Sequence, residues 1–272
     1  YNIFLTYIKN ELDNERYLEK LKKHEKYKHL PNAFEHNIQL KKEDFQDIMS
    51  QFTKKLADES IPVIIAEIGQ NHDGSLGMAH AYIDALADAG VDAIKFQTHI
   101  ASEESTLDEQ FRVKFSYQDK TRFDYWKRME FSESQWMELK NHSNEKGIEF
   151  LSTPFSISAV NLLSKIGVEA WKLGSGDTTS DSMLDLMIST KKPIIMSSGM
   201  SSWKELDENV KKVSDKGSTY YLMQCTSKYP TPLNEVGLNL LDDLKNRYGC
   251  RVGLSDHSGS TSPALASISR GF

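Results

Sequence analysis

The sequence predicts an α/β protein built on a parallel (β/α)8 TIM barrel. From Ile61 onward, short β-branched apolar runs alternate with amphipathic helical patterns. Polar residues follow each apolar run, and parallel barrels assemble their sites at these carboxyl ends of the strands. An open doubly wound sheet is the alternative. It is disfavoured because Gly69 and Gly74 lack the G-x-G-x-x-G spacing of a dinucleotide-binding turn.

Seven strands are expected within residues 61–272, which form the predicted barrel domain. Their ranges are 61–68, 91–96, 148–151, 170–173, 193–196, 219–224 and 251–254. An eighth strand should begin where the sequence stops, at Phe272. We therefore expect a barrel that is truncated before its eighth strand.

Residues 1–60 differ in character and are predicted to form a helical extension of unknown role. Residues 10–28 are mostly charged or polar and suggest a solvated helix. Residues 43–56 carry one apolar face, which is expected to pack on the barrel floor rather than on a second subunit. Residues 98–131 are predicted to form a long insertion that lies over the site. Residues 132–147 are predicted to form a helix that begins with a capping box of Ser132 and Gln135.

Composition limits the possible partners and location. The formal charge is −6 and the isoelectric point is about 5.8, so no basic field favours nucleic acid. No apolar run is long enough to cross a bilayer. Cys225 and Cys250 are expected to be small core residues rather than a disulfide, which suits a cytoplasmic protein.

The predicted strand ends carry an inventory of polar side chains. Glu67 is the only carboxylate of the first strand, and its alternative role is a structural acid paired with a barrel lysine. Lys95 and Lys172 predict an anionic ligand, although each could instead form an interior salt bridge. The inventory is Glu67, Asn71, His72, Lys95, Gln97, Ser152, Thr153, Lys172, Ser175, Ser197, Ser198, Gln224, Thr226, Ser227, Ser255, Asp256 and His257.

Six of these strand-end segments resemble the motifs of the sialic acid synthase family. They are A-E-I-G-Q-N-H-D-G-S from Ala66, K-F-Q-T from Lys95, K-L-G-S-G-D-T from Lys172, S-S-G-M from Ser197, Q-C-T-S-K-Y-P from Gln224 and G-L-S-D-H-S-G from Gly253. The resemblance covers residues 61–272. Within the family, 174–178 and 224–227 are more similar to the animal-type branch, which makes N-acetylneuraminate 9-phosphate.

The resemblance implies a transferase that condenses phosphoenolpyruvate with an N-acetylmannosamine-type sugar. It assigns the catalytic acid to Glu67. It places Gln97, Asp177 and Tyr229 near the sugar. The implied phosphoenolpyruvate site consists of Lys95, Thr153, Lys172, Ser175, Ser197 and Ser255, with Ser227 where many members have Asn.

The resemblance also implies a divalent metal, Mn²⁺ or Mg²⁺, that polarises the sugar aldehyde. Its ligands would be His257 and a second histidine that lies beyond Phe272. Carbon 3 of phosphoenolpyruvate would attack the aldehyde, and phosphate would leave after water adds at carbon 2. The family further implies a C-terminal antifreeze-like domain and a homodimer for the full-length protein, and we expect a fragment without them to be inactive.

Three functions remain open from the sequence. The first is N-acetylneuraminate synthesis from N-acetylmannosamine or its 6-phosphate. The second is synthesis of a related nonulosonic acid, such as pseudaminic or legionaminic acid. The third is an inactive barrel that binds a sugar phosphate, or a partner through residues 1–60.

Overall fold

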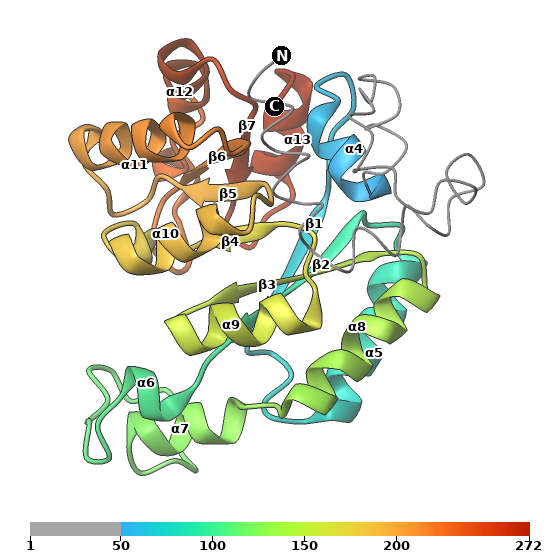
Figure 1. The fold of residues 1–272 in the computed structure, drawn as a ribbon, viewed down its shortest axis with the longest axis vertical. Helices are drawn as coiled ribbons and strands as arrows, with labels where there is room; N and C mark the ends of the chain where they lie inside the picture. Colours follow the sequence, from blue (N-terminus) through green and yellow to red (C-terminus); the bar gives the residue numbers. More distant parts are fainter. Residues whose placement is uncertain (1–49) are drawn as a thin grey trace, which may run out of the picture.

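The protein is an α/β structure of parallel strands and covering helices (Figure 1). A computed structural model describes residues 50–272, so the predicted helix at 10–28 lies outside the described residues. All seven predicted strands are present. They are β1 Ile65–Gly69, β2 Ala93–Thr98, β3 Glu149–Pro154, β4 Trp171–Leu173, β5 Ile194–Ser197, β6 Tyr220–Cys225 and β7 Val252–Ser255.

The strands pair in parallel as two sheets. One has the order β1-β2-β3 and the other β4-β5-β6-β7, and β3 lies beside β4. Strand order follows chain order throughout, as a barrel requires. The parallel α/β class is confirmed, whereas a closed eight-stranded barrel stays a prediction.

Helices separate the strands as the alternating pattern predicts. They are α4 Gln51–Ala57, α5 Leu76–Asp88, α6 Ala101–Glu104, α7 Arg122–Met129, α8 Glu133–Glu145, α9 Ile157–Ile166, α10 Asp181–Ser189, α11 Trp203–Asp215, α12 Leu240–Tyr248 and α13 Ser262–Ser269, with 3₁₀ turns at Ser175–Asp177 and Leu233–Glu235. None of the helices within 50–272 is both long and apolar enough to cross a membrane.

Local sequence explains where helix α8 begins. The Ser132 side chain accepts from the backbone N–H of Gln135, and the Gln135 side chain accepts from the backbone N–H of Ser132 at 2.8 Å. This reciprocal pair satisfies two amides that a helix start leaves without partners. The predicted capping box is therefore confirmed.

Two apolar clusters lie on opposite faces of the strands. The larger one joins outward side chains such as Ile94, Phe96 and Phe150 to the covering helices. The smaller one lies inside, where Phe52 and Leu56 of α4 pack against residues near the starts of the strands: Val63, Ile65, Ala93, Leu151, Ala170, Ile195, Tyr221 and Met223. Because α4 fills this end of the interior, the floor position predicted for the helix over 43–56 holds for residues 51–56, whereas residues 43–49 lie outside the described residues.

Arg251, next to β7, ties that strand to the segment that precedes β1. Its guanidinium donates to the backbone carbonyls of Lys55 at 2.7 Å, Leu56 at 3.0 Å and Asp58 at 2.7 Å, and also to that of Ile61. Two of these carbonyls belong to the last turn of α4, where helical C=O groups lack intrahelical partners. One side chain thus joins the floor helix to both ends of the strand series.

Candidate functional site

The interior changes from apolar to polar along the strands. Side chains alternate between faces along a strand, so residues two apart share one face. Ala93, Lys95 and Gln97 of β2 therefore point inward in succession. Glu67 stands opposite Lys95 in the pairing of β1 with β2, and Thr153 stands opposite Gln97 in the pairing of β2 with β3. The floor is apolar, and the carboxyl ends of the strands form a polar layer above it.

Glu67 and Lys95 form an ion pair in this layer. The other oxygen of the carboxylate accepts from Gln97 Nε2 at 3.2 Å, and Lys95 Nζ lies 3.5 Å from Thr153 Oγ1. Burial, followed by the charge of Lys172, lowers the pKa of Lys95 well below its usual range. The adjoining Glu67 carboxylate acts in the opposite direction, because a contacting negative charge favours the ammonium form. The salt-bridge alternative for these two residues therefore agrees with the geometry.

Lys172 is buried in the second sheet and contacts no carboxylate of residues 50–272. Its Nζ donates to the Leu173 carbonyl at 2.9 Å and to Ser197 Oγ. Burial lowers the pKa of Lys172 to about 8, against the opposing charges of Cys225 and Asp177. The salt-bridge alternative does not describe this lysine, whose hydrogen bonds within residues 50–272 go to neutral oxygens.

The predicted hydroxyl donors gather around Gly199. A β-carbon at this position would lie 2.6 Å from Ser175 Oγ and 2.7 Å from Ser227 Oγ, so only glycine allows both hydroxyls to approach its backbone. Ser255 ends β7 and stands opposite Cys225 in the strand pairing. Ser175 follows β4, Ser227 follows β6 and Ser255 ends β7, so all three lie at the carboxyl ends of strands in the sheet that contains Lys172.

Asp177 lies where the two sheets meet. A β-carbon on Gly174 would contact both Asp177 Oδ2 at 3.0 Å and Thr153 Cγ2 at 3.7 Å. Burial, followed by the charge of Glu104, raises the pKa of Asp177 to about 6. Its Oδ2 is buried and has no hydrogen-bond partner among the described residues. An acceptor left without a partner is costly, so a ligand hydroxyl would be favoured here.

His257 lies beside Tyr229 and Cys225. The Tyr229 hydroxyl is 3.3 Å from His257 Nε2, and the two rings are 4.3 Å apart between centroids. His257 Nδ1 lies 3.2 Å from the Thr226 carbonyl and 4.0 Å from Cys225 Sγ. Burial alone would raise the pKa of Cys225, but hydrogen bonds with His257 and Ser175 lower it to about 7. Both cysteines are free, and the Cys225 thiol is buried in contact with Ser175 and His257.

The predicted metal can be tested against this donor set. No group of three His, Cys, Asp or Glu side chains suited to a metal ion occurs within residues 50–272. His257 is a single imidazole, and both its nitrogens already face protein atoms. These residues alone do not fit a divalent ion. The proposed reaction therefore uses only protein groups, and the binding of Mn²⁺ or Mg²⁺ stays a prediction.

His99, which the inventory of strand-end residues does not contain, lies next to the side chain of Gln97. Its ring is stacked between the rings of Trp126 and Phe155, with distances between ring centroids of 3.8 Å to Trp126 and 4.2 Å to Phe155. His99 Nε2 lies 3.4 Å from Gln97 Oε1, and Nδ1 lies 2.6 Å from a Glu104 oxygen. Its position directly after the motif residues Lys95 to Thr98 was the sequence feature that could have identified it as a site residue. The predicted insertion at 98–131 supplies Trp126 and so reaches the site.

Several inventory residues turn away from the site. His72 is fully buried against Phe131, with ring centroids 4.7 Å apart, and its Nδ1 accepts from the backbone of Gly74. Ser152 bonds to Thr98 at 2.7 Å on the helix-covered face, and Gln224 donates to the Val236 carbonyl. These three are structural. The polar layer itself offers two ammonium groups, several hydroxyls and the carboxyl groups of Glu67 and Asp177, a set suited to an anionic ligand and to proton transfer.

Comparison with known proteins agrees with this fold. Residues 82–272 match the NeuB family model. The chain is 33% identical to N,N'-diacetyllegionaminic acid synthase of Campylobacter jejuni over 77% of this chain and 64% of that protein. It is 30% identical to human N-acetylneuraminate-9-phosphate synthase over 76% of this chain and 59% of that protein.

A solved structure shows the same arrangement. N-acetylneuraminic acid (sialic acid) synthetase from Leptospira borgpetersenii, crystallised with citrate, superposes with a TM-score of 0.68 at 32% identity. The match covers 78% of this chain and 70% of that one. The chain spans about three fifths of the length of the curated relatives it matches. On these grounds the chain belongs to the NeuB family, whose relatives include sialic, legionaminic and pseudaminic acid synthases.

Proposed function

We propose that this protein condenses phosphoenolpyruvate with an amino sugar of the N-acetylmannosamine type to give a nonulosonic acid and phosphate. The observation that carries the proposal is the pair of inward lysines, Lys95 on β2 and Lys172 on β4, in an acidic protein. Phosphoenolpyruvate carries a phosphate and a carboxylate. Two buried ammonium groups with hydroxyl donors match both anionic groups.

Each of these two lysines has a hydroxyl group close to its ammonium group. Ser197 contacts Lys172, and Thr153 is near Lys95. Ser175 and Ser227 face the same glycine, so a bound oxyanion could accept from both hydroxyls. We therefore assign one charged end of phosphoenolpyruvate to each sheet, with Ser255 on the side of Lys172.

The sugar is assigned to the side of Glu67, Gln97 and Asp177. The buried, unpartnered oxygen of Asp177 would accept from a sugar hydroxyl. In the proposed reaction, carbon 3 of phosphoenolpyruvate forms a bond to the aldehyde carbon, and Glu67 gives a proton to the new alkoxide. Water then adds at carbon 2, and the carbon–oxygen bond to phosphate breaks. Lys95 and Lys172 hold the developing negative charge.

The ion pair of Glu67 with Lys95 is compatible with these roles. An anionic substrate would compete with Glu67 for the ammonium of Lys95. Losing that partner favours the protonated form of the carboxyl group, because an adjacent cation had favoured its charged form. Binding of phosphoenolpyruvate would thus prepare Glu67 to donate a proton.

The experiment that tests this proposal measures phosphate release from phosphoenolpyruvate by the purified protein with different sugars. N-acetylmannosamine, its 6-phosphate, and the precursor sugars of legionaminic and pseudaminic acid are compared, with and without Mn²⁺. Mass spectrometry should detect a nine-carbon product with one of them. Absence of product with every sugar, alongside intact binding of a sugar phosphate, would support an inactive binding barrel instead.

A second candidate is legionaminic acid synthesis. The chain is 33% and 35% identical to two N,N'-diacetyllegionaminic acid synthases, and 30% identical to the human N-acetylneuraminate-9-phosphate synthase. The same assay separates the candidates, because the substrate sugars differ in their acetamido groups and in the 6-phosphate. The precursor sugar of legionaminic acid should be turned over in preference to N-acetylmannosamine 6-phosphate if this second candidate is correct.

A further inference from the structure

The ring of His99 is fixed by contacts on both faces and at Nδ1. Its faces are covered by Trp126 and Phe155. Nδ1 lies 2.6 Å from one oxygen of Glu104, and the other oxygen of that carboxylate accepts from the backbone N–H of Ile100 at 2.8 Å. The His99 side chain is only 4% exposed. These contacts leave little freedom for the ring to turn, so the direction of its remaining nitrogen, Nε2, is set.

Nε2 of His99 faces the side-chain amide of Gln97, 3.4 Å from Oε1. The other partner of this amide fixes which way it points. Gln97 Nε2 donates to Glu67 Oε1 at 3.2 Å, and a carboxylate only accepts, so the NH2 group faces Glu67 and the amide oxygen faces His99. An amide turned by 180° would place its oxygen against the carboxylate. A donor at His99 Nε2 therefore favours the orientation that holds Glu67.

We propose that His99 is a positioning residue, which keeps the NH2 group of Gln97 directed at the Glu67 carboxyl group. This inference rests on the proposed function, in which Glu67 protonates the new alkoxide. The contact of His99 is with the far side of the Gln97 amide, so the histidine acts through Gln97 and not on the reacting atoms.

The orientation of Gln97 determines which oxygen of Glu67 donates the proton. Glu67 Oε2 forms the ion pair with Lys95, and Oε1 accepts from Gln97. When an anionic substrate draws Lys95 away, the Gln97 amide still holds the carboxyl group. A hydrogen bond from an N–H group favours the unprotonated oxygen of a carboxylic acid, so the proton binds to Oε2. The acidic oxygen then faces the position that the ammonium group has left.

A cycle of single and double substitutions tests whether His99 acts through Gln97. His99→Phe keeps a stacked ring but removes both nitrogens. We expect kcat to fall about tenfold to a hundredfold, because a small misplacement of a reacting group is costly, while phosphoenolpyruvate affinity stays within about twofold by calorimetry. In a Gln97→Ala background the same substitution should change kcat by less than about twofold. Effects that multiply in the double variant would overturn the proposal.

Two further variants keep the test decisive if His99→Phe does not fold. The side-chain nitrogen of glutamine has about the reach of histidine Nε2, and that of asparagine has about the reach of Nδ1. His99→Gln can therefore still donate to Gln97, whereas His99→Asn cannot. The Gln variant should retain a several-fold higher kcat than the Asn variant. Equal kcat values in the two folded variants would also overturn the proposal.

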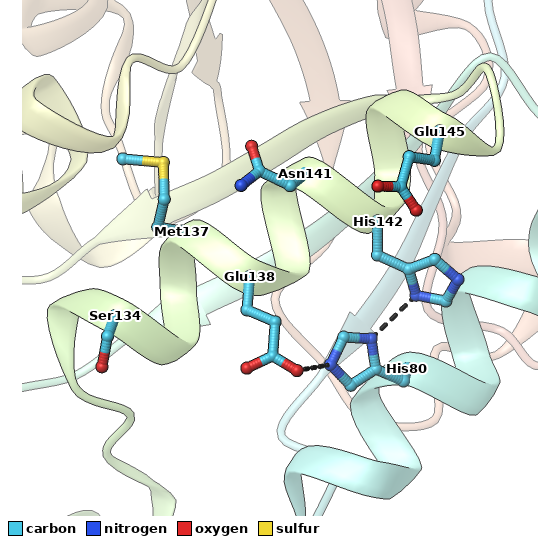
Figure 2. A pocket seen from close by; sticks show the side chains of 7 residues that line it. All are labelled: His80, Ser134, Met137, Glu138, Asn141, His142 and Glu145. Atoms are coloured by element: carbon cyan, nitrogen blue, oxygen red, sulfur yellow. Dashed lines mark hydrogen bonds and ion pairs between the residues drawn. The ribbon is translucent and has the colours of Figure 1, made fainter.

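His80 provides a matched control on the outside of the molecule. It lies between helices α5 and α8, where Nδ1 is 2.8 Å from a nitrogen of His142 and Nε2 is 3.0 Å from an oxygen of Glu138 (Figure 2). Both ring nitrogens thus have partners, as in His99, but neither partner belongs to the strand-end site. His80→Phe should leave kcat unchanged even if it lowers the melting temperature.

Hydrogen exchange of the Gln97 side-chain amide tests the positioning role without turnover. In NMR spectra its NH2 protons should exchange with solvent several-fold faster in His99→Phe than in the parent protein, and at the parental rate in His80→Phe. An unchanged rate in His99→Phe would contradict the positioning role even in an active enzyme. Failure of the proposed function has a different signature, because the parent protein would then give no nine-carbon product with any sugar.

Discussion

Glu67 is both an ion-pair partner and the proposed proton donor, and one substitution separates the two roles. Glu67→Gln keeps the shape but cannot transfer a proton. Turnover should fall about a hundredfold or more while phosphoenolpyruvate still binds. Steady-state kinetics and calorimetry measure the two effects. Near-normal turnover together with a lowered melting temperature would assign Glu67 a structural role.

The inward lysines should carry most of the affinity for phosphoenolpyruvate. Lys95→Met and Lys172→Met each remove a charge-assisted contact worth about 1.5–3 kcal/mol, so affinity should fall about tenfold to a hundredfold. Calorimetry with phosphoenolpyruvate measures this directly. Lys127→Met, on an ammonium group that is largely exposed, is the matched control and should bind normally. Unchanged binding in both inward variants would refute the assignment.

Lys172 also predicts a pH dependence. Its pKa is lowered to about 8, so the ammonium form is lost as pH rises through 8. The rate constant kcat/KM reports groups of the free enzyme, and for phosphoenolpyruvate it should fall about tenfold per pH unit above that value. In Lys172→Met the constant should be lower throughout and lack this inflection. An inflection near pH 8 that survives the substitution belongs to another group.

At the scale of single elements, the first residue of β3, Glu149, is a carboxylic acid whose charged form destabilises the folded state. Burial, followed by the charge of Glu169, raises the pKa of Glu149 to about 7. The folded state then binds the proton more tightly than the unfolded state, so stability falls as pH rises from about 4.5 to 7. Glu149→Gln should match the parent in denaturant unfolding near pH 4 and exceed it by up to about 3 kcal/mol at pH 8. Equal stability at pH 8 would show that Glu149 is charged at little cost.

Element positions were predictable where local chemistry decides them. The β-branched runs located every strand to within a few residues, and Ser132 with Gln135 located the start of α8. The inward or outward direction of a strand-end residue was harder to predict. Gln224 lies within β6 and His72 follows β1, but the contacts of Gln224 with Val236 and of His72 with Phe131 turn both away from the polar layer that contains Lys95. Such contacts leave no periodic signal in the sequence.

At the scale of the whole molecule, the interior divides into an apolar floor and a polar layer. The sequence predicted the polar layer because hydroxyl, amide or charged residues lie at or next to the carboxyl end of each predicted strand. It could not predict that Asp177 would lie beside Thr153, or that Gly199 would separate Ser175 from Ser227. Those contacts join different strands, and their distances depend on how the two sheets meet.

The bonds of Arg251 to the chain before β1 have a consequence for folding kinetics. They connect residues 190 to 196 positions apart, so forming them requires nearly all of the intervening chain to be ordered. Contacts of such long range are expected after the rate-limiting step, with a φ-value near zero. Arg251→Met should therefore speed unfolding several-fold and leave refolding almost unchanged in stopped-flow chevron plots. Slower refolding would instead mean that the first and last strands meet early, and that the series of strands is assembled from its ends.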